Sequence, residues 1–142
     1  MMRILTLLGT PSVTLLALAL NLLARHRLYS RRERTALLAF AAAASVVLYS
    51  GTLGYLPLDL YRAGFSPWAP VALAIAAIVV APRSPAIAIT ALMALVAYDI
   101  PVFRSVNLFD YVVDPIVGIV ACGWLVLRGT ALTARGIRSG ND

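Results

Sequence analysis

Residues 99–115 read DIPVFRSVNLFDYVVDP, and this stretch divides a chain that is otherwise almost continuously apolar. It holds three of the six acidic residues of the chain, together with one Arg and two prolines. Proline ends or kinks helices, and an aspartate is costly within hydrocarbon. The stretch therefore predicts a polar connection between two apolar helices, one ending near residue 99 and the other beginning near residue 108.

The composition around this stretch is that of a membrane protein. Of the 142 residues, 61% are hydrophobic and only 13% are charged, whereas soluble domains carry about 25% charged residues. A membrane-crossing helix needs about 20 apolar residues. We expect a single all-α integral membrane domain, a multi-pass transmembrane bundle of about five helices over residues 4–24, 35–56, 67–81, 85–99 and 108–127. Residues 128–142 are expected to form a frayed polar tail.

Two details of these runs qualify the assignment. The first run contains Pro11, and we expect it to be retained as a kinked helix rather than removed as a signal peptide. The third and fourth runs are shorter than the others, so whether they cross a bilayer completely stays open.

The distribution of basic residues predicts the orientation. All 12 basic residues are Arg, and with five spans nine of them fall on the side of the C-terminus and three on the other side. Positively charged loops stay in the cytoplasm. We therefore expect an N-terminus outside, a cytoplasmic C-terminus and a location in the inner membrane of a bacterium.

The densest charge lies in residues 25–34, RHRLYSRRER. Ser30 followed by Glu33 is a capping box, which predicts a helix that begins near Arg31. We interpret the Arg residues as a topology signal that binds lipid phosphate, with a docking site for a cytoplasmic partner as the alternative. The net charge of +6 is thereby explained without nucleic acid as a partner. The five residues are Arg25, Arg27, Arg31, Arg32 and Arg34.

The acidic stretch supports two local interpretations. Asp110 and Asp114 are four residues apart, so in one helix they would share a face and repel each other unless a cation, a proton or Arg104 lay nearby. In one interpretation Asn107 caps a helix that kinks at Pro115. In the other, Asp114 itself is the N-cap and Pro115 is the first helical residue.

From these features we predict candidate contacts for an ion, a ligand or a partner protein. The alternative is that the same aspartates are ordinary helix caps, with Asp–Arg pairs that hold a hairpin at the membrane surface. The primary candidates are Asp99, Arg104, Asp110 and Asp114; the secondary ones, on the same outer face, are Asp59, Arg62, Trp68 and Tyr98.

The sequence offers little for catalysis. Residues 107–110 (NLFD) resemble the second aspartate motif of prolipoprotein signal peptidases, but the first motif of that family is missing. Asp110 and Asp114 share the spacing of phospholipid-synthesising phosphotransferases, whose preceding motif elements are absent. With a single His, His26, and a single Cys, Cys122, we predict no metal site, no cofactor and no catalytic residues.

The function expected from the sequence is that of a small non-catalytic membrane protein, an accessory or structural subunit of a larger membrane complex. Its partners would be membrane lipids and other membrane subunits, or further copies of itself. The alternative is a small oligomeric transporter or channel element, in which the acidic residues form an outward-facing cation or proton site. An enzyme is the least favoured class.

Overall fold

The computed structural model describes residues 11–24, 28–57, 59–103 and 105–139, with side chains described as far as residue 131. Within these ranges the chain is all-helical: it has seven helices and no strand. They are α2 (Val13–Leu23), α3 (Arg31–Thr52), the 3-10 helix η1 (Leu60–Phe65), α4 (Ala69–Val80), α5 (Pro85–Asp99), α6 (Leu108–Val112) and α7 (Pro115–Ser139).

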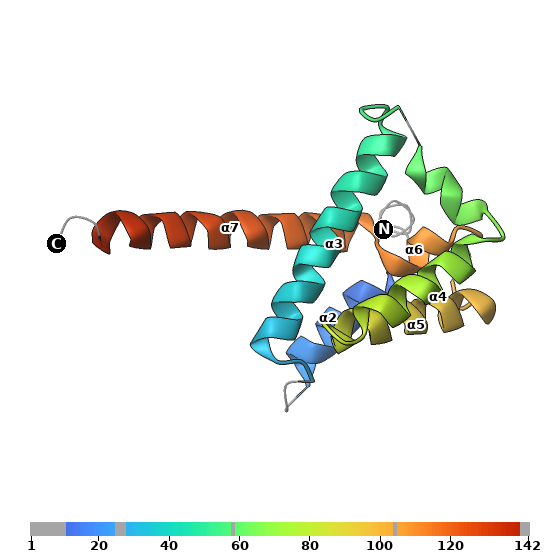
Figure 1. The fold of residues 1–142 in the computed structure, drawn as a ribbon, viewed down its shortest axis with the longest axis horizontal. Helices are drawn as coiled ribbons and strands as arrows, with labels where there is room; N and C mark the ends of the chain where they lie inside the picture. The colour runs from blue at the N-terminus through green and yellow to red at the C-terminus, as the bar shows by residue number, and fades with distance from the viewer. Residues whose placement is uncertain (1–10, 25–27, 58, 104, 140–142) are drawn as a thin grey trace, which may run out of the picture.

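The helices are arranged in two groups that meet at α3. The helices α4 and α5 form a hairpin, and α5 also packs against α2, α3 and α6. On its other side α3 crosses α7, which extends beyond the rest of the bundle (Figure 1). The core lies between these groups and is made of small and mid-sized residues, among them Leu37, Ala41, Val117 and Ala121.

Small residues set the closest helix approaches. Ala86, Thr90 and Ala94, which the sequence places at a spacing of four, are all buried in α5. At the crossing of α3 and α7, Gly118 lies directly against Ser45. Such pairs let helix backbones approach closely.

The helix ends agree with the local signals in the sequence. Ser30 caps α3, since its hydroxyl accepts the Glu33 N–H at 3.1 Å. At the other end Gly54 has φ +80°, and the N–H of Tyr55 bonds to the carbonyl of Ser50 at 2.9 Å. Glycine adopts this left-handed conformation without strain, so the chain turns away after α3.

Three expected boundaries differ from the structure. The described helix α2 begins after Pro11 rather than running through it; residues 4–10 lie outside the described residues. The predicted span 108–127 is interrupted, since α6 ends at Val112 and α7 begins at Pro115. The helix α7 continues to Ser139, so the expectation of a frayed tail from residue 128 was wrong for the backbone.

Only α3 is both long and apolar enough to cross a membrane, among the described residues and by length and composition alone. It has 22 residues, so it measures about 33 Å. The core helix of a soluble protein passes the same test. The all-helical class is therefore established for the described residues.

Candidate functional site

The buried carboxyl group of Asp114 lies where two helices begin. Its Oδ1 accepts the N–H of Val117 at 2.8 Å, which makes Asp114 the N-cap of α7. Its Oδ2 accepts the N–H of Ser12 at 2.6 Å. Asp114 is only 3% exposed. One carboxyl group thus joins the start of α2 to the start of α7, across 102 residues of sequence, through hydrogen bonds of the stronger, charge-assisted kind.

The first residues of α2 complete this junction. Ser12 caps α2 through its hydroxyl, which accepts the Leu15 N–H at 3.2 Å. The Thr14 hydroxyl donates to the carbonyl of Val112 at 2.5 Å, at the end of α6. Ser12 and Thr14 are both fully buried. The Ser12 bond satisfies a backbone N–H at the start of α2, and the Thr14 bond satisfies a carbonyl that the break between α6 and α7 leaves without a helical partner.

A second carboxyl group organises the Asp110 cluster, which consists of Tyr61, Ser105, Asn107 and Asp110. The hydroxyls of Tyr61 and Ser105 each donate to Asp110, both at 2.5 Å. Asn107 caps α6 by accepting the Phe109 N–H at 2.9 Å, and its Nδ2 donates to the Tyr61 carbonyl at 3.0 Å. The cluster therefore fastens η1 to α6.

The Tyr61 hydroxyl is held in its protonated form by this environment. Burial raises the pKa of Tyr61 above its ordinary value of 10.0, and the hydrogen bond to Asp110 and the charge of Asp110 raise it further. Each of these causes disfavours a second negative charge beside the carboxyl group. Tyr61 consequently acts as a hydrogen-bond donor.

Aromatic rings pack against one another at the loop between α5 and α6. Tyr111 is fully buried, and its hydroxyl donates to the carbonyls of Phe103 at 2.6 Å and Ser105 at 3.1 Å. Its ring meets Tyr98 edge-on at 5.4 Å and Phe103 at 5.1 Å. These contacts place Ser105 where it reaches Asp110.

The structure distributes the residues predicted from the sequence over several places. Asp110 and Asp114 do not share one helix face, because α6 ends between them. Asn107 and Asp114 are both N-caps, so each of the two local interpretations is right about one residue. Asp99 is exposed at the end of α5, and Arg104 lies outside the described residues.

The secondary candidates mostly face outward. Asp59, Arg62 and Trp68 are exposed, whereas Tyr98 packs on Tyr111 and donates a long hydrogen bond to the Val106 carbonyl. None of the three exposed residues joins the Asp110 cluster or the Asp114 cap. Whether any of them contacts a ligand or a partner stays a prediction.

The opposite end of the molecule holds a feature that the sequence analysis missed. Glu33 reaches from α3 to the start of α5, where its Oε2 accepts both the Ser84 hydroxyl and the Ala86 N–H at 2.9 Å. The sequence signal was the capping box, in which Glu33 was expected to serve its own helix. The long-range partner is a consequence of the fold.

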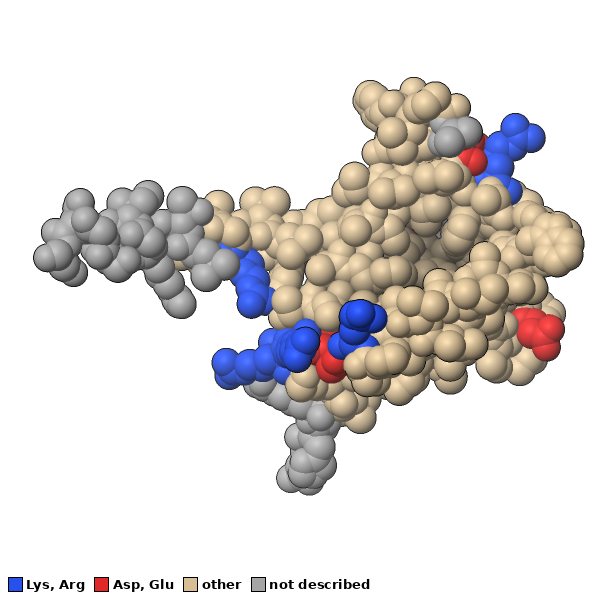
Figure 2. Space-filling model, in the orientation of Figure 1, with Lys and Arg blue, Asp and Glu red and all other residues tan. Residues whose placement is uncertain are grey.

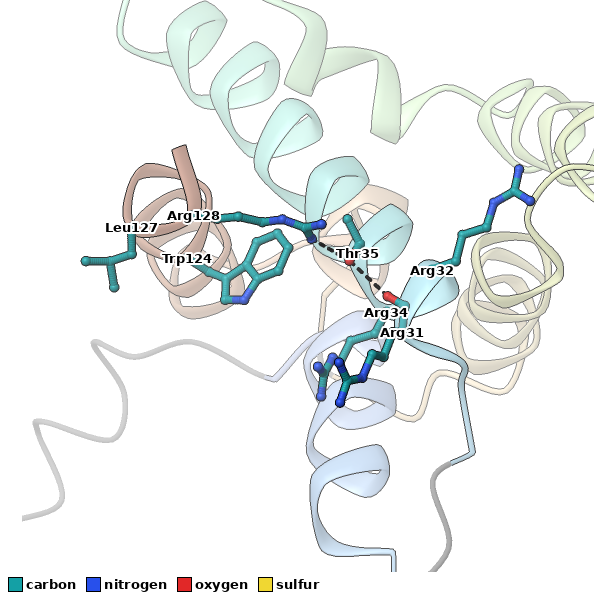
Figure 3. Close-up of a pocket in the computed structure, with 7 residues that line it drawn as sticks. All are labelled: Arg31, Arg32, Arg34, Thr35, Trp124, Leu127 and Arg128. Carbon is teal, nitrogen blue, oxygen red and sulfur yellow. Dashed lines mark hydrogen bonds between the residues drawn. The ribbon is translucent and has the colours of Figure 1, made fainter. Parts of the chain in front are cut away.

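Beside this contact an open pocket of about 660 Å³ lies between the first turns of α3 and the middle of α7 (Figure 3). Arg128 donates to the Thr35 hydroxyl at 2.7 Å and lies 5.0 Å from the centre of the Trp124 ring. Arg25 and Arg27 lie outside the described residues. The pocket is lined by Arg31, Arg32, Arg34, Thr35, Trp124, Leu127 and Arg128.

The chemistry available at these sites is that of binding and support. Asp110 and Asp114 each accept two hydrogen bonds from donors of the chain itself. In the described part of the chain no group of three or more His, Cys, Asp or Glu residues is placed to hold a metal ion. The carboxyl groups of Glu33, Asp110 and Asp114 thus connect separate elements of the fold, and the Arg-lined pocket offers donors that an external anion could use.

Comparisons with protein-family models, with curated proteins and with solved structures find no match for this chain.

Proposed function

We propose that this protein is a small non-catalytic subunit of the bacterial inner membrane, a multi-pass helical bundle that packs against other membrane proteins. Its supporting observation is the surface of the helices. Ile78 is 70% exposed, Ile119 75% and Leu127 72%, each on a different part of α4 or α7. Soluble monomers rarely leave apolar surface of this extent in water. Lipid, or another membrane protein, is the environment that suits it.

The distribution of charge supports the same proposal. Figure 2 shows charged side chains at separate ends of the molecule, with a wide uncharged surface between them. Glu33 and the α3 Arg residues of the pocket lie at the start of that helix, where Glu33 contacts the start of α5. The exposed Asp99 lies at the opposite end of α5, and the exposed Asp59 and Arg62 follow the opposite end of α3. An uncharged belt between two polar ends matches a bilayer between two aqueous phases. The excess of Arg makes the end with the pocket the cytoplasmic one.

The short helices fit this arrangement with local adjustment. The helix α4 has 12 residues and α5 has 15, so they measure about 18 and 22 Å, short of a hydrocarbon core of about 30 Å. A bilayer thins around short spans at a modest cost per ångström. Contact with a larger partner would remove the mismatch, which favours a subunit over an isolated bundle.

Membrane insertion is tested with two engineered cysteines in a Cys122→Ser background. Asp59→Cys should react with an impermeant maleimide added to intact cells, and Arg83→Cys should react only after the cells are opened. Both positions are exposed, so accessibility is matched. Release of the protein from membranes by alkaline carbonate, or labelling of both cysteines in intact cells, contradicts the proposed topology.

The subunit assignment is tested by extracting the tagged protein from native membranes in polymer nanodiscs and measuring the particle mass. We expect the protein part of the particle, after the lipid and polymer mass is subtracted, to be well above the 15.1 kDa of one chain, with a second polypeptide in fixed stoichiometry. A monomer, or an oligomer of this chain alone, contradicts the proposal.

A second candidate is a cation or proton transporter, and the observation that favours it is the buried carboxyl group of Asp114. In a membrane protein such a group is costly and is commonly functional. Purified protein in liposomes would then show cation or proton flux that Asp114→Asn abolishes while the variant still reaches the membrane in the same amount. Unchanged flux in Asp114→Asn eliminates this candidate.

A further inference from the structure

The Arg-lined pocket has more positive charge than its surroundings balance. Arg31 and Arg34 come from one face of α3, and Arg128 approaches them from α7. Glu33 is the acidic residue of the same turn, but its Oε2 is occupied by Ser84 and Ala86 of α5. Among the residues that the structure describes, none of the pocket Arg residues forms an ion pair with a carboxylate. Like charges at this spacing repel one another unless an anion lies between them.

The donors are also placed for one ligand. In Figure 3 the side chains of Arg31 and Arg34 lie side by side, and Arg32 points away from them. The bond to Thr35 and the contact with Trp124 hold the Arg128 guanidinium in a defined position. A guanidinium held in this way offers two parallel N–H donors, the arrangement that suits a phosphate group.

The remaining lining is apolar on the side of α7. Leu127 is 72% exposed and, like Trp124, lines the pocket from α7. The indole N–H of Trp124 makes no hydrogen bond within the described chain. A tryptophan with an apolar ring and a free donor is typical of the level of lipid head groups. A ligand with a phosphate head and hydrocarbon chains would satisfy both kinds of surface.

We propose that this pocket binds the phosphate head group of an anionic phospholipid from the cytoplasmic leaflet, an inference that rests on the membrane location proposed above. Arg31, Arg34 and Arg128 are its phosphate ligands, and Trp124 and Leu127 meet the upper part of the acyl chains. From the sequence, only the Arg residues within the segment 25–34 were expected to bind lipid phosphate. Arg128, Thr35 and Trp124 join the site because α7 crosses α3.

The test uses the fluorescence of Trp124 in a Trp68→Phe background, because the chain has only two tryptophans. The protein is reconstituted in phosphatidylcholine bilayers that contain a small share of phosphatidylglycerol, brominated near the head-group end of its chains. Bromine quenches tryptophan on contact. We expect stronger quenching than when the same share of phosphatidylcholine carries the bromine in a phosphatidylglycerol-free bilayer. Equal quenching overturns the proposal.

The charge dependence is tested with Arg34→Gln/Arg128→Gln. Each basic residue at a membrane surface contributes roughly a fivefold preference for anionic lipid, so the double variant should lose about 30-fold. The matched control is Arg62→Gln/Arg83→Gln, which removes the same charge at two exposed sites outside the pocket. The control should lose much less of the quenching of Trp124, because neither residue lines the pocket that holds this side chain. An equal loss in both variants shows general surface attraction and overturns the site.

Two further arms separate the remaining outcomes. Millimolar inorganic phosphate should leave the quenching unchanged, and relief of quenching by phosphate alone overturns a lipid ligand in favour of a soluble one.

If the double variant does not fold, native mass spectrometry of the unaltered protein decides: preferential retention of phosphatidylglycerol over phosphatidylcholine of equal chain length supports the site, and equal retention overturns it. Protein that stays in the membrane without this preference contradicts the pocket alone; protein that alkaline carbonate releases contradicts the proposed function as well.

Discussion

The crossing of α3 and α7 depends on the absence of a side chain at Gly118. A Cβ atom at this position would lie 2.6 Å from Oγ and 2.9 Å from Cβ of Ser45. Rotation of the Ser45 side chain cannot relieve the contact between the two Cβ atoms, because Cβ is fixed to the backbone. Rotation would also break the hydrogen bond from the Ser45 hydroxyl to the Ala41 carbonyl, at 2.7 Å. Gly118→Ala therefore forces the two helices apart.

The cost follows from two opposing effects. Ordinary contacts start at 3.4 Å, so the helices must separate by about 0.5 Å, and overpacking of this kind costs about 1–3 kcal/mol. Replacing glycine by alanine within a helix stabilises the helix by about 1 kcal/mol, which opposes this cost. The matched control is Gly123→Ala on the same helix, where a Cβ meets nothing within 4 Å. The difference between the two variants isolates the overpacking cost and should be about 1–3 kcal/mol.

The assay is reversible unfolding in mixed micelles, followed by helix content as dodecyl sulfate is increased. Gly118→Ala should unfold at a lower dodecyl sulfate fraction than Gly123→Ala. Ser45→Gly should destabilise the Gly118→Ala protein less than it destabilises the unaltered protein, because only in the variant does it also remove the side chain that the new methyl group meets. If Gly118→Ala is as stable as Gly123→Ala, or if Ser45→Gly has the same effect in both backgrounds, the close crossing of α3 and α7 is refuted.

Three further predictions use the same unfolding assay. Asp114→Asn places an amide donor against a backbone N–H and should cost about 1–3 kcal/mol, whereas Asp99→Asn, at an exposed site, should change stability by less than about 0.5 kcal/mol. Because the pKa of Tyr61 is raised in the folded protein, the stabilisation that its protonated hydroxyl provides is fully present below pH 10.0, the ordinary pKa, and is lost as the pH rises through the pKa of the folded state. Tyr61→Phe should therefore flatten the loss of stability above pH 10.0. An unchanged alkaline profile would show that the protonated Tyr61 hydroxyl does not stabilise the fold. Glu33→Ala removes the acceptor for two donors at the start of α5 and should cost about 1–2 kcal/mol, so full stability would contradict that contact.

Local signals predicted most helix positions well. The Ser30 cap, Pro85 at the start of α5 and the end of α5 at Asp99 are all recognisable in the sequence, because caps and prolines act within a single turn. Where local signals conflicted, the prediction failed. Asn107 and Asp114 each mark a helix start, and the structure uses both by breaking the predicted span into α6 and α7.

Long-range partners were outside the reach of such signals. The sequence identified Asp110 and Asp114 as unusual, but it paired them with each other and with Arg104. In the fold their partners are Tyr61, Ser105 and Ser12. Hydroxyls and backbone N–H groups occur throughout any chain, so composition and spacing do not reveal which of them a carboxyl group will meet.

The sequence by itself determined that this chain is helical, that it is far more apolar than a typical soluble domain, and that five of its Arg residues fall within residues 25–34, since these follow from composition and short-range order. Only the tertiary structure decided that Asp114 joins α2 to α7, that Glu33 leaves its own helix to cap α5, and that Arg128 completes a pocket with Arg31 and Arg34. The physical reason is that these contacts bring together residues far apart in the chain, and their positions are fixed by how closely small residues such as Gly118 allow the helices to approach.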